Sequence, residues 1–366
     1  MNKQRYGLSV VTYTYNDHDL VAGLLASMAD WDFLPKEVIV VDDGSDAPFV
    51  LPDGAPSARV LRLDANQGPA MAKIAGLKAG GGRFLLSLDA DIRLPPDWAT
   101  RCLPVAAAPE VGLVATPILD DAGLGLLADY QCLRFSLQLA GPESPKVLPA
   151  GLWLMRREVW RKFGFGEYRQ RLHEDVYFSG KLRRVGLALR LLPEPVARQV
   201  RRLSRRTMVR RGWTWQGGEY LEAAARDETG AVNAFLVAMR VRILRHQVAD
   251  RRFAYYDYLY LAHALDGLLR AAGRPESQRR GLAALLAEAL PGRELGAVFG
   301  ADMAALGCPP LAAPSDSFLE AVAAGARSVL PEAFAAAVTD ALPHLLAEDD
   351  RRDWHFSFYD AAPEAR

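Results

Sequence analysis

Asp89 and Asp91 follow an apolar run at residues 84–88 and are the side chains of this sequence best suited to chemistry. The run has no turn residue and no helical period, which predicts a strand buried on both faces of a parallel sheet. Because side chains alternate along a strand, both carboxylates should leave its carboxyl end in the same direction, where open α/β sheets bind ligands. Carboxylate oxygens suit Mg²⁺ or Mn²⁺, with phosphate and water as further ligands. The alternative is a strand end that only caps the following turn.

A second acidic pair, Asp42 and Asp43, follows the predicted strand at residues 37–41, and Gly44 allows a sharp turn beside it. Acids at this end of a strand can hydrogen-bond to ribose hydroxyls or to base edges. The alternative is a turn in which the aspartate side chains accept hydrogen bonds from backbone N–H groups.

Lys73 lies one turn into a predicted helix at residues 69–79, which follows a third predicted strand at residues 59–63. A lysine at this place could reach a phosphate or a base in the same crevice. An exposed lysine on the surface of the helix is the alternative interpretation.

The elements before these residues also follow an α/β pattern. Residues 8–12 predict the first strand, and Asn16 or Asp17 should cap a helix that ends near residue 28. The turn between them has no glycine, whereas a dinucleotide-binding turn requires Gly-x-Gly-x-x-Gly. This counts against an oxidoreductase.

In the second half, Glu174 and Asp175 stand before a predicted helix. The helix dipole favours negative charge in the first turn, so a carboxylate there should stay ionised at neutral pH and could accept a hydroxyl proton. We predict Asp175 as the base and Glu174 as its substitute or as an acceptor ligand; an acid pair that only caps the helix is the alternative. His173 could be a hydrogen-bonding partner or a ligand.

Residues 198–211 contain seven arginines, with apolar residues at helical spacing, and predict an amphipathic basic helix. Three uses remain open. Arg210 or Arg211 could clamp a diphosphate, the helix could lie on anionic lipid, or it could pair with acids elsewhere in the chain.

Length and composition limit the wider interpretation. A chain of 366 residues is longer than one hydrophobic core usually supports, so we expect a second, smaller unit. Because 44 basic residues balance 44 acidic ones, the net charge gives no indication of nucleic-acid binding. Three widely spaced cysteines suggest free thiols in a reducing compartment. With no membrane-spanning run, we expect a cytoplasmic protein, or one peripheral to the inner face of the membrane.

From about residue 230 the sequence changes to alanine- and leucine-rich helices separated by proline and glycine, and Pro343 should end the last of them. We therefore predict a first domain at residues 1–220, with two halves at 1–92 and 93–220. A helical domain should occupy residues 221–366.

Four short motifs at strand ends together resemble the nucleotide-sugar half of a family 2 glycosyltransferase of the GT-A fold. They are Ser-Val-Val with Thr-Tyr-Asn at residues 9–16, Val-Val-Asp-Asp-Gly-Ser at 40–45, Asn-Gln-Gly at 66–68 and Leu-Asp-Ala-Asp at 88–91. The Glu174 and Asp175 pair is also similar to that family. The resemblance implies that residues 1–92 are the nucleotide-sugar half and residues 93–220 the acceptor half. The resemblance ends near residue 215. It implies an α/β fold of Rossmann-like type, with a mostly parallel sheet flanked by helices, and leaves the helical C-terminal part unexplained.

By this resemblance, Asp43 would contact the nucleoside, Asp89 the ribose, and Asp91 together with Asp89 the Mn²⁺ or Mg²⁺ ion on the diphosphate. Thr14, Asp42 and Lys73 would belong to the same nucleotide-sugar site, although Lys73 stands where the family often has arginine. The family often has a histidine metal ligand after the acid pair, and residues 195–200 contain none. The metal would then be held by Asp91, diphosphate and water, or Arg198 would supply the charge.

The resemblance implies a hexosyltransferase that moves a sugar from a nucleoside diphosphate, uridine diphosphate first among the candidates, to a hydroxyl with inversion. The acceptor would be a glycan, a lipid-linked molecule or a protein, in surface polysaccharide or glycoconjugate synthesis. Two other classes stay open. A dehalogenase-like phosphatase would require Gly-Thr after the Asp-x-Asp, where Ile92 and Arg93 stand. A non-catalytic scaffold of the same fold that binds nucleotide or carbohydrate is the more serious alternative.

Overall fold

The computed structural model describes residues 4–55, 57–120, 125–139, 145–166, 168, 173–201, 203–312 and 316–348. The chain divides into two compact units. The first comprises residues 1–122 and 134–201, and the second comprises residues 123–133 and 202–366. Residues 202–220 thus group with the second unit, whereas the sequence placed them in the first domain, so the domain boundary at residue 220 stays a prediction.

A seven-stranded sheet forms the centre of the first unit, in the order β11-β8-β10-β6-β2-β4-β5. All neighbouring strands are parallel except β10, which runs antiparallel to both β6 and β8. This confirms the predicted α/β fold with a mostly parallel sheet. The strands are β2 (Leu8–Thr14), β4 (Glu37–Asp42), β5 (Ala58–Arg62), β6 (Phe84–Leu88), β8 (Val111–Ala115), β10 (Leu152–Arg156) and β11 (Ala188–Leu191).

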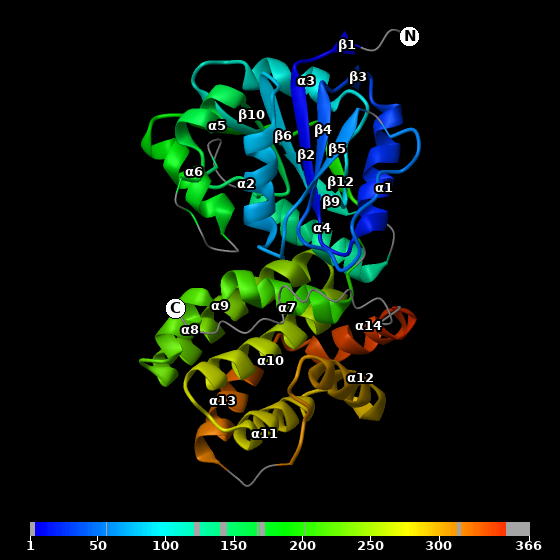
Figure 1. Ribbon diagram of the computed structural model, residues 1–366. Coiled ribbons are helices and arrows are strands. Elements are labelled where there is room, and N and C mark those ends of the chain that lie inside the picture. The colour runs from blue at the N-terminus through cyan, green and yellow to red at the C-terminus, as the bar shows by residue number, and fades with distance from the viewer. Residues whose placement is uncertain are drawn as a thin grey trace. The chain divides into compact units, whose positions relative to one another are not determined.

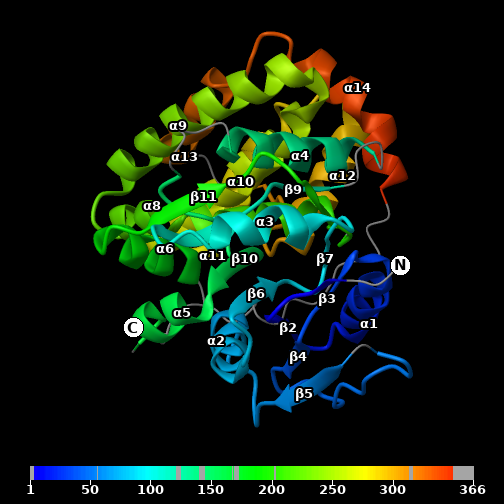
Figure 2. The same ribbon diagram turned by 90° about the horizontal axis from the view of Figure 1, so that it is seen from above.

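Helices cover both faces of this sheet, because each central strand is apolar on both sides. Val10 and Val11 of β2, for example, are both fully buried but belong to different cores. One core includes residues of α1 (His18–Ser27) and α3 (Trp98–Ala106). The other includes residues of α2 (Pro69–Ala79), α5 (Arg157–Phe163) and α6 (Glu174–Arg184). Figures 1 and 2 show α1 and α2 on opposite sides of the strands.

A small three-stranded sheet lies next to the end of β6. Its strands are β7 (Ile92–Arg93), β9 (Ile118–Asp120) and β12 (Ala197–Gln199), with β12 in the middle. Gln199 pairs with Ile92, and the N–H of Val200 donates to the backbone oxygen of Asp91 at 2.8 Å. Residues that are far apart in sequence therefore meet beside Asp91. The other elements of this unit are β1 (Gln4–Arg5), β3 (Phe33–Leu34) and the 3-10 helix η1 (Met28–Asp30).

The predicted basic helix at residues 198–211 is wrong in its first half. Strand pairing takes residues 197–199 into β12, and helix α7 begins only at Arg205. Ser204 caps α7, because its Oγ accepts a hydrogen bond from the N–H of Thr207 at 3.1 Å.

Helices are the only regular secondary structure in the described residues of the second unit, which confirms the predicted helical C-terminal part. Its central helix is α10, in which Tyr255, Tyr256 and Tyr258 are fully buried, so the aromatic side chains of this helix pack in a core. Pro343 does not end the last helix; it lies inside α14. The helices are α7 (Arg205–Gln216), α8 (Gly218–Ala224), α9 (Glu228–Ala249), η2 (Arg251–Phe253), α10 (Ala254–Ala271), α11 (Glu276–Ala287), α12 (Gly292–Ala305), α13 (Ser317–Ser328) and α14 (Phe334–Ala347), and the first residues of α4 (Leu126–Leu139) also belong here. Within the described part of the chain, no helix has the length and apolar character needed to cross a bilayer.

Candidate active site

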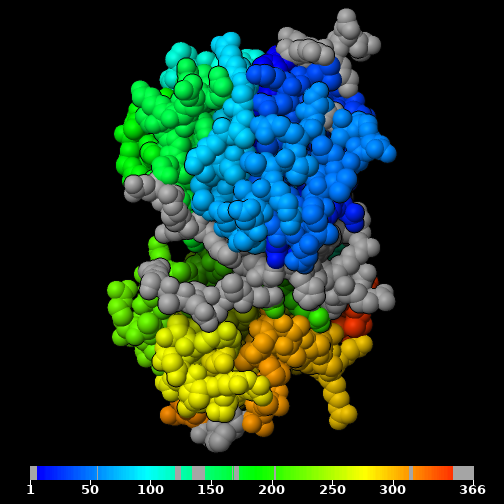
Figure 3. All heavy atoms as spheres, in the orientation of Figure 1, coloured from blue at the N-terminus to red at the C-terminus, as the bar shows by residue number. Residues whose placement is uncertain are grey.

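Asp89 stands at the carboxyl end of β6, and its backbone N–H donates to the Gly151 oxygen at 2.9 Å. The Tyr13 hydroxyl donates to Asp89 Oδ1 at 3.0 Å, and Lys73 Nζ lies 3.3 Å from the same oxygen. Lys73 is only 2% exposed, although its helix α2, light blue in Figure 3, lies at the surface of the first unit. The interpretation of Lys73 as an exposed helix lysine is therefore wrong.

Lys73 also joins Asp89 to the acid pair of the second half. Its Nζ donates to Glu174 Oε1 at 3.0 Å, across 101 positions of sequence. Burial alone would lower the pKa of Lys73, but the nearby Asp89 and Glu174 carboxylates and Tyr13 raise it well above its ordinary value. Lys73 is thus a fixed ammonium that holds two carboxylates in place.

Asp175 lies beside this buried group, in the first turn of α6, and is half-buried. Its Oδ1 accepts a hydrogen bond from the N–H of Val176 at 2.8 Å. Burial, followed by the charge of the adjacent Glu174, raises the pKa of Asp175 above its usual value. This direction is opposite to the effect of the helix dipole, which favours the ionised form.

Asp91 is held by two side chains from the β12 region. Arg201 Nε donates to Asp91 Oδ2 at 2.7 Å, and Gln199 Nε2 donates to the same oxygen at 3.1 Å. Arg201 also donates to Asp17 Oδ2 at 2.8 Å. The side chains of Arg201 and Asp91 are each 9% exposed, so this is a buried ion pair that fixes the position of Asp91.

Asp42 is fully buried and is used to hold its own turn. It accepts hydrogen bonds from the N–H groups of Ser45 and Phe49, both at 2.9 Å, and one from Arg62. Burial opposes ionisation of Asp42, but these backbone donors and the guanidinium hold its pKa below the usual range. These hydrogen bonds agree with the alternative interpretation of the sequence, in which the aspartate side chain holds a turn.

Asp43 is also buried, and it accepts hydrogen bonds from the N–H groups of Gln67 at 2.9 Å and Gly68 at 2.8 Å. It therefore shapes the loop before α2. The preceding turn needs its glycine, because Gly44 has φ +72° and a Cβ there would lie 2.5 Å from the Ala65 backbone carbon.

Thr14 is buried at the end of β2, and its Oγ1 accepts a hydrogen bond from the N–H of Asp17 at 3.2 Å. Through Asp17 and Arg201 this residue is linked to Asp91.

Arg210 and Arg211 belong to the second unit. Arg210 donates to the Ala305 oxygen at 3.0 Å, and the Arg211 guanidinium lies 4.7 Å from the ring centre of Trp215. Their contact with a diphosphate stays a prediction.

The donor set fits a hard divalent cation. Asp89 and Asp91 supply carboxylate oxygen, and Mg²⁺ is commonly held by one or two carboxylates while phosphate and water supply the other ligands. The described residues contain no group of three or more His, Cys, Asp or Glu side chains that could hold a metal ion. An ion at Asp89 and Asp91 would therefore need phosphate or water as further ligands. Arg201 and Lys73 would orient the two carboxylates in this arrangement.

Sequence analysis missed Tyr13, Asp17, Gln199 and Arg201 as members of this site. Gln199 and Arg201 are two positions apart, which places both on one side of an extended chain. The arginine-rich composition of the segment favoured a helix instead, so this signal was overlooked.

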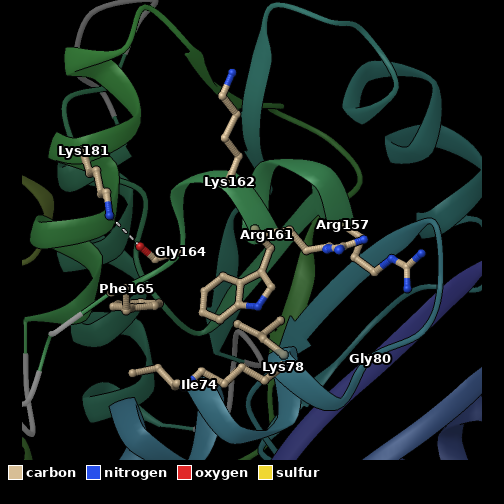
Figure 4. A pocket seen from close by; sticks show the side chains of 12 residues that line it. Ile74, Lys78, Gly80, Arg157, Arg161, Lys162, Gly164, Phe165 and Lys181 are labelled. Atoms are coloured by element: carbon tan, nitrogen blue, oxygen red, sulfur yellow. Dashed lines mark hydrogen bonds between the residues drawn. The ribbon is translucent and has the colours of Figure 1, made fainter.

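A separate concavity of about 440 Å³ lies over α2, α5 and α6 (Figure 4). Its floor is apolar, and Figure 4 shows Arg157 and Arg161 next to each other at its edge, while Lys181 donates to the Gly164 oxygen at 2.8 Å. None of the predicted site residues lines it. The lining residues are Ile74, Leu77, Lys78, Gly80, Arg157, Trp160, Arg161, Lys162, Gly164, Phe165, Gly166 and Lys181.

Comparison with known proteins finds sequence relatives for the first part of the chain. Residues 9–164 match the sequence profile described as Glycosyl transferase family 2. The succinoglycan biosynthesis protein ExoO of Rhizobium meliloti is 36% identical over 134 residues, which are 35% of this chain and 38% of that protein. An N-acetylglucosaminyltransferase of Bradyrhizobium elkanii is 31% identical over 113 residues, 29% of this chain and 62% of that protein. The chain thus spans less than two thirds of the length of either relative.

Among solved structures, the mannosyltransferase PcManGT from Pyrobaculum calidifontis, in complex with GDP-Man and Mn²⁺, is similar with a TM-score of 0.45 and 20% identity. That similarity covers 93% of this chain and 85% of the other. The segment that matches the family profile contains Asp42, Lys73, Asp89 and Asp91. Residues 9–164 of this chain are thus similar to glycosyl transferase family 2.

Proposed function

We propose that this protein is a glycosyltransferase that transfers a sugar from a nucleoside diphosphate to an acceptor hydroxyl. The observation that carries this proposal is the buried contact Asp89–Lys73–Glu174. It links the Asp-x-Asp acids, inside the family 2 segment, to the acid pair at residues 174–175, which lies beyond that segment. A donor diphosphate and a proton acceptor would thereby be placed in one site.

The donor would bind at the carboxyl ends of β2, β4 and β6, with Asp89 on the ribose side and Asp91 facing the diphosphate. A uridine nucleotide is the first candidate. Mn²⁺ or Mg²⁺ at Asp91 and Asp89 would offset the charge that develops on the leaving diphosphate. Asp42 and Asp43 would contribute by holding the turn and the loop that border this site.

Asp175 would accept the proton of the acceptor hydroxyl. Its raised pKa brings it closer to the operating pH, where a base is both ionised and able to take a proton. Glu174 suits this role less, because Lys73 binds it in a buried pair. Direct attack by the activated hydroxyl would invert the anomeric carbon.

The acceptor would be a glycan, a lipid-linked molecule or a protein. ExoO is named for succinoglycan biosynthesis and the Bradyrhizobium relative for N-acetylglucosamine transfer, which favours a role in surface polysaccharide or glycoconjugate synthesis.

The test is release of nucleoside diphosphate from a panel of UDP-, GDP-, dTDP- and CDP-sugars, with hydrolysis as the basal reaction. We expect turnover of one nucleotide class in the wild type, loss of it in Asp175→Asn, and full turnover in Asp53→Asn, which changes an exposed acid in a turn. Binding of a nucleotide sugar without turnover by the wild type, with any acceptor extract, would favour the non-catalytic scaffold instead.

A further inference from the structure

Helix α9 has apolar side chains on two sides. Phe235, Met239 and Ile243 pack into the core of the second unit. A separate row faces away from that core: Val237 is 67% exposed, Val241 and Leu244 are each 48% exposed, and Val248 is 87% exposed. Four of the eleven exposed large apolar side chains in the described residues thus lie on this one helix, which can be found in Figures 1 and 2.

The four residues form one continuous stripe, because they are spaced by four, three and four positions. This spacing is also that of a coiled-coil seam, and it extends along about 16 Å of helix. The stripe therefore suits either a second helix or an apolar layer of similar extent.

The charges beside the stripe distinguish these two occupants. Residues 229–249 contain no Asp or Glu, and Arg240 and Arg245 are exposed on the two sides of the stripe. Arg242 turns inward instead, and its Nε donates to Asp257 at 2.9 Å. The exposed edge of α9 is thus apolar and purely cationic.

A second copy of the chain fits this edge poorly. With the stripe as the seam, Arg240 and Arg245 take the two flanking positions that oppose each other in paired helices. Parallel pairing would place Arg240 against Arg245 of the other copy, and antiparallel pairing would place each arginine against itself. Both arrangements set like charges opposite each other.

We propose that the α9 stripe docks on an anionic membrane surface. The valine and leucine side chains would enter the boundary between headgroups and acyl chains, and Arg240 and Arg245 would contact lipid phosphates. A helix of this kind lies in the interface and does not cross the membrane. This surface replaces residues 198–211 as the lipid-binding segment, because Arg205 is buried there against Asp302 at 2.7 Å.

The test is co-sedimentation of the full-length protein with vesicles of phosphatidylcholine alone or with about 30% phosphatidylglycerol. We expect binding to the anionic vesicles only. Each arginine near an anionic surface contributes about fivefold to partitioning, so R240Q/R245Q should weaken binding about 30-fold. The matched control R226Q/R293Q, which removes two exposed arginines elsewhere in the second unit, should bind as the wild type does.

The apolar part is tested by V241S/V248S, with L311S/L346S as a control for exposed aliphatic side chains in the same unit. We expect only the first pair to lose vesicle binding, with unchanged circular dichroism. Equal binding to neutral vesicles, or equal losses in the α9 variants and their controls, would overturn the proposal. It would also be overturned if sedimentation velocity showed a dimer that V241S/V248S dissociates, because the stripe would then be covered by a second copy.

Discussion

Replacing Lys73 by methionine removes the positive charge between the buried Glu174 carboxylate and the partly exposed Asp89 carboxylate, while preserving most of the side-chain volume. In the wild type, Lys73 Nζ lies 3.0 Å from Glu174 and 3.3 Å from Asp89. Trp153 lies next to it, with the ammonium 5.9 Å from its ring centre. The Glu174 side chain is only 8% exposed, so water cannot replace the lost partner well.

The expected cost follows from the loss of one partner of a buried ion pair, which typically costs about 3–5 kcal/mol. We therefore expect K73M to lower the free energy of unfolding by about that amount at pH 7, because Glu174 keeps its buried charge without a counter-ion.

The assay is urea unfolding at pH 7, followed by tryptophan fluorescence. K78M is the matched control, because Lys78 lies on the same helix but is exposed, and it should change the free energy of unfolding by less than about 0.5 kcal/mol. The double variant K73M/E174L should recover the part of the loss that comes from Glu174, since an apolar pair can replace a buried ion pair; Asp89, which is partly exposed, still loses its partner. A K73M protein as stable as the wild type at pH 7, or an equal loss of stability in K78M, would refute this reasoning.

Three further predictions follow from the same site. Asp42→Asn should lower the free energy of unfolding by about 1–3 kcal/mol at neutral pH, because the Arg62 guanidinium and two backbone donors lose a carboxylate. The wild-type pKa of Asp42 is lowered on folding, so its contribution is present above the ordinary aspartate range and disappears as pH falls below it; denaturation of both proteins at low pH should therefore show a smaller difference. Arg201→Gln should weaken binding of the donor nucleotide by about tenfold in calorimetry, because Asp91 loses the group that orients it, and unchanged affinity would contradict this role. The rate of sugar transfer should fall on the acid side at a pH above the ordinary aspartate pKa, because Asp175 must be ionised to act as a base and its pKa is raised; a pH–rate profile that stays flat down to the ordinary aspartate range would argue against Asp175.

Local sequence pattern was sufficient to place Asp89, Asp91 and Lys73. An apolar run without helical period predicted β6 with its acids at the carboxyl end, and Pro69 with the glycines after residue 79 delimited α2. The pattern did not show that Lys73 is buried, since its partner Glu174 is 101 positions away.

The role of Arg201 depends on strand pairing over a long sequence distance. Residues 197–199 become a strand because β7 and β9 pair with them, and their own arginine-rich composition gives no such signal. For Asp42 and Asp43, the sequence predicted the position at a strand end. It left their hydrogen-bond partners open: backbone N–H groups bind both carboxylates, as is common for aspartates in turns.

The measurement that tests the central claim most directly is calorimetric titration of UDP, GDP, dTDP and CDP with and without Mn²⁺. It compares the wild type with Asp91→Asn and with the exposed-acid control Asp53→Asn. We predict that one nucleotide binds in a Mn²⁺-dependent manner, that Asp91→Asn abolishes this binding, and that Asp53→Asn preserves it. Failure of all four nucleotides to bind the wild type, or binding that Asp91→Asn leaves unchanged, would contradict the assignment of the donor site to Asp89 and Asp91.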